Sequence, residues 1–167
     1  MASEKLLKEL NDQMNFEFLS GYYYMAMAAY AANEDFNGFA NFLIVQGQEE
    51  YTHGMKFFDF INDMDGRATM QTIEEPKNEY GSLLEVFEEA LSHEKLVTSR
   101  INKLMDMAKE ENNHATVSFL QWFVDEQLEE ENSMKTIVNN LRRMEGHFQG
   151  LYMLDKELGT RTLEPIE

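Results

Sequence analysis

The sequence predicts an all-α protein: a four-helix bundle with a long crossover between its second and third helices and a short fifth helix near the C-terminus. Only two prolines occur in 167 residues, so most of the chain is free to be helical. Long segments repeat apolar residues at alternating spacings of three and four, which is typical of helices that pack in bundles. The length fits a single domain, residues 1–167, with a substantial core.

Capping signals divide residues 3–145 into four long helices. Short polar side chains favour the N-cap position because they accept a hydrogen bond from the first helical turn. The predicted N-caps are Ser3, Asp35, Ser82 and Asn113. The four helices are expected to end near residues 33, 65, 110 and 143. A short fifth helix is expected over residues 148–158, closed by Gly159.

The connection between the second and third helices, residues 64–81, sets the predicted topology. Its 18 residues could extend to about 59 Å, which exceeds the roughly 45 Å length of each helix. The connection can therefore run along the whole bundle and make the second and third helices parallel. The short connections on either side make the first and second helices, and the third and fourth, antiparallel.

Composition excludes several classes of function. The net charge is −17, from 31 acidic and 14 basic residues, which argues against nucleic acid or an anionic membrane as partner and favours cations. The absence of cysteine excludes disulfides and thiolate metal sites. No apolar run is long enough for a signal peptide or a membrane span, so a soluble cytoplasmic protein is expected.

In each long helix the apolar residues at spacings of three and four form a seam along one face. Each seam is interrupted near its middle by a carboxylate. These residues are Glu17, Glu50, Glu94 and Glu130. Measured from the end of the bundle where the second helix begins, all four lie about 18 to 24 Å along the axis. They are therefore expected to form one buried cluster. Such a cluster needs compensation, because each buried ion costs several kcal/mol and neighbouring carboxylates raise one another's pKa.

Two divalent cations would balance these four negative charges. His53, one turn after Glu50 on the same face, adds a nitrogen ligand. Oxygen-rich coordination with one imidazole suits iron or manganese better than copper, and zinc also fits. A single polar seam residue is more simply explained as a register-setting position, but five at one level favour a metal site. The alternative is a purely structural acidic bundle that binds no metal.

These features resemble the bacterial non-haem ferritins over essentially the whole chain. The motifs that carry the resemblance are Glu50-x-x-His53, Gln127-x-x-Glu130, Glu17 and Glu94. Related di-iron bundles have a second Glu-x-x-His motif, but Ser133 stands where its histidine would be. That departure disfavours bacterioferritins and rubrerythrins, and the absence of cysteine further disfavours rubrerythrins. Tyr51 stands where bacterioferritins place a haem-binding methionine, so no haem is expected.

The resemblance implies a ferritin-like fold and an iron-storage protein with ferroxidase activity. It implies oxidation of Fe(II) to Fe(III) by dioxygen or hydrogen peroxide, and deposition of ferric mineral inside a hollow homo-oligomeric cage of 24 subunits. Two irons per subunit are expected. Glu17, Glu50 and His53 would hold the first, and Glu50 would bridge to the second, held by Glu94 and Glu130. Glu50 and Glu130 are the residues expected to matter most for oxidation.

The resemblance also assigns roles to neighbouring residues. A third iron position is implied at Glu49, Glu126 and Glu129, which from the residues alone would be a solvated acidic face. Tyr24 is implied in electron supply to the oxidant, the alternative being an ordinary core tyrosine. Gln127 is expected beside the second iron. The remaining histidines are interpreted as surface or interface residues: His93, His114 and His147.

Two related functions share parts of this pattern. A di-iron or di-manganese oxidase that stores no iron, such as a peroxide-scavenging bundle protein, needs the same site but no cage. Particle size and iron loading would separate it from a storage protein. A DNA-protecting mini-ferritin builds its site between subunits. The complete set of ligands within one bundle, the absence of a basic tail and the fifth helix disfavour that alternative.

Overall fold

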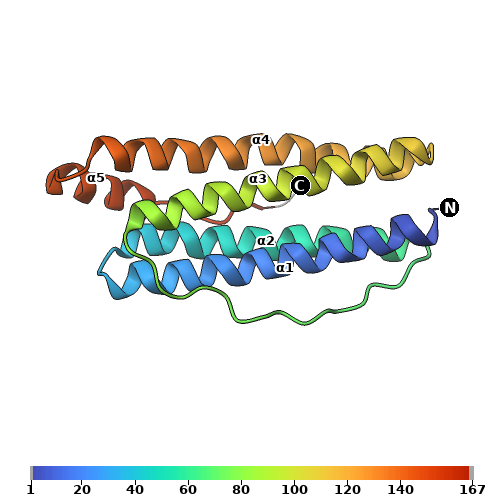
Figure 1. Ribbon diagram of the computed structural model, residues 1–167, viewed down its shortest axis with the longest axis horizontal. Helices are drawn as coiled ribbons and strands as arrows, with labels where there is room; N and C mark the ends of the chain where they lie inside the picture. The colour runs from blue at the N-terminus through green and yellow to red at the C-terminus, as the bar shows by residue number, and fades with distance from the viewer. Residues whose placement is uncertain (1, 166–167) are drawn as a thin grey trace.

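The computed structural model describes residues 2–165, and over this range the chain folds into a bundle of long helices (Figure 1). The helices are α1 (Glu4–Asn33), α2 (Asn37–Asp63), α3 (Leu83–Glu110), α4 (His114–Arg143) and α5 (Phe148–Leu158). The four long helices lie side by side, and the short α5 lies at one end of the bundle. The predicted all-α bundle with a short fifth helix is confirmed.

Three of the four predicted N-caps are confirmed. Ser3, Ser82 and Asn113 each accept a hydrogen bond from the backbone N–H three residues later, at 3.0 to 3.1 Å. The prediction for Asp35 was wrong, because Phe36 is the N-cap of α2 and Asp35 has a φ of 62°. A short polar residue tolerates this left-handed conformation. Asp35 therefore forms the turn that reverses the chain between α1 and α2.

The crossover from α2 to α3 runs along the length of the bundle, so these two helices are parallel (Figure 1). Two asparagines of α1 hold it in place. Asn11 accepts from the Thr69 backbone N–H at 2.7 Å and donates to the Thr69 carbonyl at 3.1 Å. Asn15 accepts from the Gln71 N–H at 2.8 Å. Because these side chains satisfy backbone groups of the crossover, the segment needs no regular secondary structure to lie against α1.

The interior consists of two apolar cores separated by a polar layer. The α5-side core includes Tyr24, Phe39, Leu43, Phe87 and Ile137. The opposite core includes Leu6, Leu10, Phe57, Ile101 and Phe123. Burial of such large side chains contributes about 1.5 to 3 kcal/mol each. The two cores therefore supply the stability that fixes the position of the polar layer between them.

Two glycines bring α1 and α2 close together beside that layer. A Cβ on Gly21 would lie 3.0 Å from the carbonyl oxygen of Gly47, and a Cβ on Gly47 would lie 3.1 Å from that of Gly21. Both distances are shorter than an ordinary van der Waals contact. The Gly21 position is also 3.6 Å from the Cβ of Glu50. The missing side chains thus allow the two backbones to approach where the layer begins.

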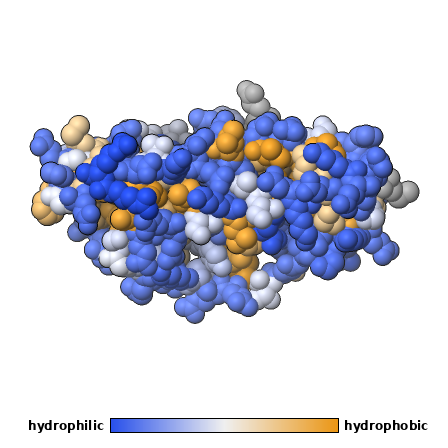
Figure 2. Space-filling model, turned by 45° about the horizontal axis from the view of Figure 1, so that its top comes forward, coloured by the Kyte–Doolittle hydropathy of each residue, from blue (hydrophilic) through white to orange (hydrophobic). Residues whose placement is uncertain are grey.

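The surface is largely polar. The face drawn in Figure 2 is mostly hydrophilic, and its hydrophobic side chains lie in separate patches. Within residues 2–165, no helix combines the length and the apolar character that crossing a lipid bilayer requires.

Candidate metal centre

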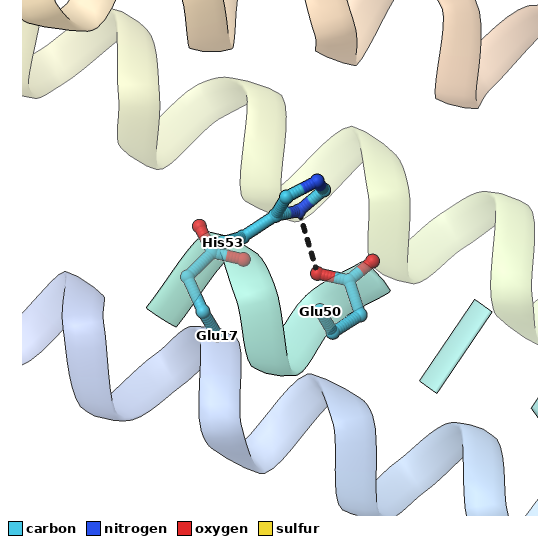
Figure 3. A group of neighbouring side chains, drawn as sticks. All are labelled: Glu17, Glu50 and His53. Carbon is cyan, nitrogen blue, oxygen red and sulfur yellow. Dashed lines mark hydrogen bonds and ion pairs between the residues drawn. The ribbon is translucent and has the colours of Figure 1, made fainter. Parts of the chain in front are cut away.

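The four seam carboxylates converge in the polar layer between the two apolar cores. Glu17, Glu50, Glu94 and Glu130 come from four different helices, and none is more than 4% exposed. Glu17 on α1 points toward Glu50 and His53 on α2 (Figure 3). One ligand atom from each of these three lies within 4.8 Å of the others. The helix seams therefore bring the predicted first-iron residues together.

A second group of ligand atoms shares the same imidazole. His53, Glu126 and Glu130 also offer atoms within 4.8 Å of one another. Each ring nitrogen of His53 has a different carboxylate partner. Nδ1 lies 3.3 Å from Glu50, and Nε2 lies 3.9 Å from Glu126. The sequence predicted Glu130 together with Glu94 at the second iron. Within residues 2–165, Glu94 belongs to neither group of converging atoms, so the second iron at Glu94 and Glu130 stays a prediction.

Glu94 is held by hydrogen bonds on both of its oxygens. The Tyr24 hydroxyl donates to Oε1, and the Gln127 amide donates to Oε2 at 3.1 Å. Gln127 also donates to the Glu94 carbonyl at 3.2 Å. Gln127 and Tyr24 thus lie beside the carboxylates, as the sequence predicted, and they contact the centre through Glu94.

The carboxylate oxygens fit bound cations better than they fit their own surroundings. Glu17 Oε2 and Glu130 Oε1 are buried and have no hydrogen-bond partner among residues 2–165, which is costly for a charged group. Burial, followed by neighbouring carboxylates, holds the pKa values of Glu17, Glu50 and Glu130 well above the usual 4.5. Cations would remove both penalties, because they coordinate the unpaired oxygens and favour the ionised form.

Comparison with known proteins shows the family. A sequence profile of the ferritin-like domain matches residues 7–144. The chain belongs to the ferritin family. It is 46% identical over 164 residues to the bacterial non-heme ferritin of Staphylococcus aureus strain MRSA252, covering 98% of this chain and 99% of that protein. It is 45% identical to the bacterial non-heme ferritin of Staphylococcus epidermidis over 162 residues, or 97% of this chain and 98% of the relative.

Solved ferritin structures have the same fold. An open-pore ferritin from the archaeon Archaeoglobus fulgidus aligns with a TM-score of 0.96 at 44% identity, covering 97% of this chain and 99% of its own. A humanized archaeal ferritin aligns with a TM-score of 0.98, also at 44% identity, covering 99% and 100%. The resemblance to bacterial non-haem ferritins and the ferritin-like fold are thereby confirmed.

The imidazole at the centre of this ferritin-family chain is oriented by aromatic residues. Trp122 and Phe123 both meet the His53 ring in edge-on arrangements, at centroid distances of 5.3 and 5.9 Å. The ammonium group of Lys56 lies 4.2 Å from the Trp122 ring. These contacts restrict rotation of the imidazole, so its two nitrogens stay directed at the two groups of carboxylates.

Two glutamines at the centre were missed as site residues. Gln13 donates to Glu17 Oε1 at 2.7 Å. Gln46 donates to Glu50 Oε1 at 3.1 Å and to Glu130 Oε2 at 2.8 Å. Each glutamine stands four residues before a seam glutamate on its own helix, a spacing that puts both on one face. This Gln-x-x-x-Glu spacing is the sequence signal that could have identified them.

An arginine fixes each of these glutamines in turn. Arg100 of α3 donates to Gln13 Oε1 at 2.7 Å, and Arg161 donates to Gln46 Oε1 at 2.9 Å. An amide whose oxygen accepts from arginine must turn its NH₂ group toward the carboxylates. The arginines therefore determine that both glutamines act as hydrogen-bond donors to the centre.

The three residues predicted for a third iron position do not converge. Glu126 lies with His53 and Glu130, as described above. Glu49 forms an ion pair with Arg161 at 2.8 Å, and Glu129 is exposed. Within residues 2–165, neither Glu49 nor Glu129 belongs to a group of three converging ligand atoms. Their role as iron ligands stays a prediction.

His93, interpreted from the sequence as a surface or interface residue, is half-buried. Its ring stacks on Phe16 at a centroid distance of 5.3 Å, and its Nε2 lies 2.7 Å from the Ser20 hydroxyl. Burial lowers the pKa of His93 to about 4. His114 and His147 are exposed. His93 therefore packs between α1 and α3 as a neutral residue.

Proposed function

We propose that this protein stores iron and has ferroxidase activity, oxidising Fe(II) to Fe(III) with dioxygen or hydrogen peroxide and depositing ferric mineral inside a hollow cage. Iron is the substrate in this proposal. The observation that carries it is the buried layer of four carboxylates and one imidazole, in which Glu17 Oε2 and Glu130 Oε1 have no hydrogen-bond partner in the described part of the chain. Membership of the ferritin family supports the same function.

Two Fe(II) ions would bind within each subunit. We assign the first to Glu17, Glu50 and His53, and the second to Glu94 and Glu130, with Glu50 bridging the two. Two electrons, one from each ion, reduce dioxygen to hydrogen peroxide or hydrogen peroxide to water. Carboxylates favour the product because hard oxygen ligands stabilise the higher charge of Fe(III). The raised pKa values of Glu17, Glu50 and Glu130 mean that protons leave these groups when cations bind.

Storage requires assembly, because a single bundle cannot enclose a mineral. We propose a homo-oligomeric cage of 24 subunits. Two apolar surfaces support contacts between copies. A surface hollow of about 810 Å³ between α1 and α2 is lined by Tyr22, Met25 and Tyr51, and α5 exposes 88% of Phe148 and 63% of Tyr152. A cytoplasmic location and a third iron position near Glu126 complete the proposal.

Glu50→Ala tests the oxidation step. Fe(II) is added to the assembled protein under nitrogen at two ions per chain, air is admitted, and ferric absorbance is followed together with particle mass. Loss of Glu50 should slow oxidation by roughly 10- to 100-fold. Glu88→Ala, at an exposed position of α3, is the matched control and should react like the wild type. An unchanged rate in Glu50→Ala would contradict the assignment of Glu50 to the oxidation site, and a wild type that oxidises no Fe(II) would contradict ferroxidase activity. A particle no larger than a dimer would contradict storage and favour a non-storing oxidase.

A further inference from the structure

Hydrogen bonds join α5 and the segment that follows it to α2. It runs from α5 back toward the middle of the bundle (Figure 1). Asp155 of α5 accepts hydrogen bonds from the backbone N–H groups of Gly38 and Phe39, at 2.9 and 3.1 Å. Asn41 donates to the carbonyl of Arg161 at 2.9 Å. These contacts bring Arg161 beside the central layer, although it lies outside the four-helix bundle in the sequence.

The guanidinium group of Arg161 makes the four contacts with α2 that are described here. Its guanidinium lies 4.2 Å from the ring of Phe42 and donates through Nη1 to the Phe42 carbonyl at 3.2 Å. Nη2 donates to Gln46 Oε1 at 2.9 Å and to Glu49 Oε2 at 2.8 Å. The side chains of Arg161 and Glu49 are only 22% and 19% exposed. Solvent therefore screens this ion pair less than it would screen a pair on the open surface.

The corresponding contact on the α1 side shows what is particular to Arg161. Arg100 also lies over a phenylalanine, at 4.1 Å from the Phe16 ring, and also donates to a glutamine oxygen. Its second acceptor is the backbone carbonyl of Asp12. The second acceptor of Arg161 Nη2 is the carboxylate of Glu49, which is one of the groups expected to hold a third iron. Arg161 thus places a positive charge where a metal ion would need to bind.

We propose that Arg161 competes with cations for Glu49, so that the C-terminal segment weakens the third metal position. The inference rests on the proposed function, because it presupposes that Glu49 contributes to cation binding. A cation can use the Glu49 oxygen fully only when the guanidinium has moved away. Binding at the third position therefore includes the cost of breaking the Arg161–Glu49 pair.

The test counts redox-inert Zn²⁺ ions bound to the assembled, iron-free protein by titration calorimetry. The wild type should bind two ions tightly and a third weakly. Arg161→Gln should strengthen binding of the third ion by about tenfold, equivalent to about 1.4 kcal/mol. Arg161→Lys keeps a positive charge beside Glu49 and should stay close to the wild type. Arg142→Gln removes an arginine paired with Glu88 at 2.7 Å on the surface and should leave all three affinities unchanged.

A double variant identifies the carboxylate responsible. Arg161→Gln combined with Glu49→Gln should lose the gain in affinity, because the proposed ligand is then missing. The inference is overturned if Arg161→Gln leaves binding of the third ion unchanged or if the double variant keeps the gain. Failure of the wild type to bind two ions is a different outcome. It would contradict the proposed function itself.

Discussion

The apolar cores and the layer between them use the same four helix seams but differ in how burial affects stability. In the α5-side core Phe39, Leu43 and Phe87 are fully buried, and their removal from water stabilises the fold. In the central layer Glu17 and Glu94 are buried to the same degree, yet removing a carboxylate from water destabilises it. The fold is therefore stabilised at its two ends, and the middle is stable only to the extent that cations or protons neutralise it.

The largest expected effect comes from damaging an apolar core. Phe87→Ala removes a buried ring that lies 5.7 Å from Phe39 and 5.9 Å from Phe42. Such truncations cost about 3 to 5 kcal/mol, which corresponds to a melting temperature lower by roughly 6 to 20 °C. Calorimetry should find a similar loss with and without Zn²⁺, because the ring does not contact the metal layer. Leu96→Ala, at a position that is 50% exposed, should change little. A decrease in melting temperature that occurs only without metal would contradict the conclusion that the apolar cores and the central layer contribute separately to stability.

The position of the polar layer along the bundle was easier to predict from the sequence than the contacts between its side chains. Glu17, Glu50, Glu94 and Glu130 could be placed together because the rise of a helix is constant, so each seam fixes a height along the bundle. Which oxygens pair with which partners depends on side-chain rotamers, and these have no periodicity. The assignment of Glu94 and Glu130 to one iron therefore stays a prediction.

Contacts between distant segments left no signal in the sequence. Arg161 reaches Gln46 across 115 residues and Glu49 across 112, and no helical period relates them. The contact between His93 and Ser20 likewise joins two different helices. Asp35 shows a local limit, because a short polar residue before a helix fits both an N-cap and a left-handed turn. The choice between these depends on how α1 and α2 pack.

The polar layer should make the iron-free protein sensitive to pH. The pKa values of Glu17, Glu50, Glu94 and Glu130 are raised in the folded state, chiefly by burial. Their stabilising contribution is therefore complete below the usual value of 4.5 and is lost as pH rises through the raised values. We expect a lower melting temperature at pH 8 than at pH 6, and Zn²⁺ should reverse the difference.

Glu130→Gln sharpens this prediction. The amide cannot ionise, so the iron-free variant should be more stable than the wild type at pH 8 by about 1 kcal/mol, with a weaker dependence on pH. The same variant should gain less stability from Zn²⁺, because it has lost a ligand. Denaturation at the two pH values measures both effects. If Glu130→Gln were as sensitive to pH as the wild type, the central carboxylates would not be the source of the dependence.

The smallest effect is expected at Tyr24, which belongs to both regions. Its ring is 1% exposed and packs in the α5-side core, whereas its hydroxyl donates to Glu94. Burial, followed by the charge of Glu94, holds the pKa of Tyr24 well above 10, so the phenol stays protonated. If Tyr24 gives an electron to the oxidant, its proton can pass to Glu94, the acceptor of its hydrogen bond.

Tyr24→Phe separates the two roles because it keeps the ring and removes the hydroxyl. The loss of one hydrogen bond should change stability by about 1 kcal/mol and slow Fe(II) oxidation by about fivefold, the same free energy expressed as a rate. Zn²⁺ binding should stay at two ions per chain. A tyrosyl radical signal on mixing with oxygen, present in the wild type and absent from Tyr24→Phe, would assign electron transfer to this residue. An unchanged oxidation rate together with a lower melting temperature would instead assign Tyr24 to the apolar core. Glu94 would then belong to the site of oxidation, and Tyr24 would not.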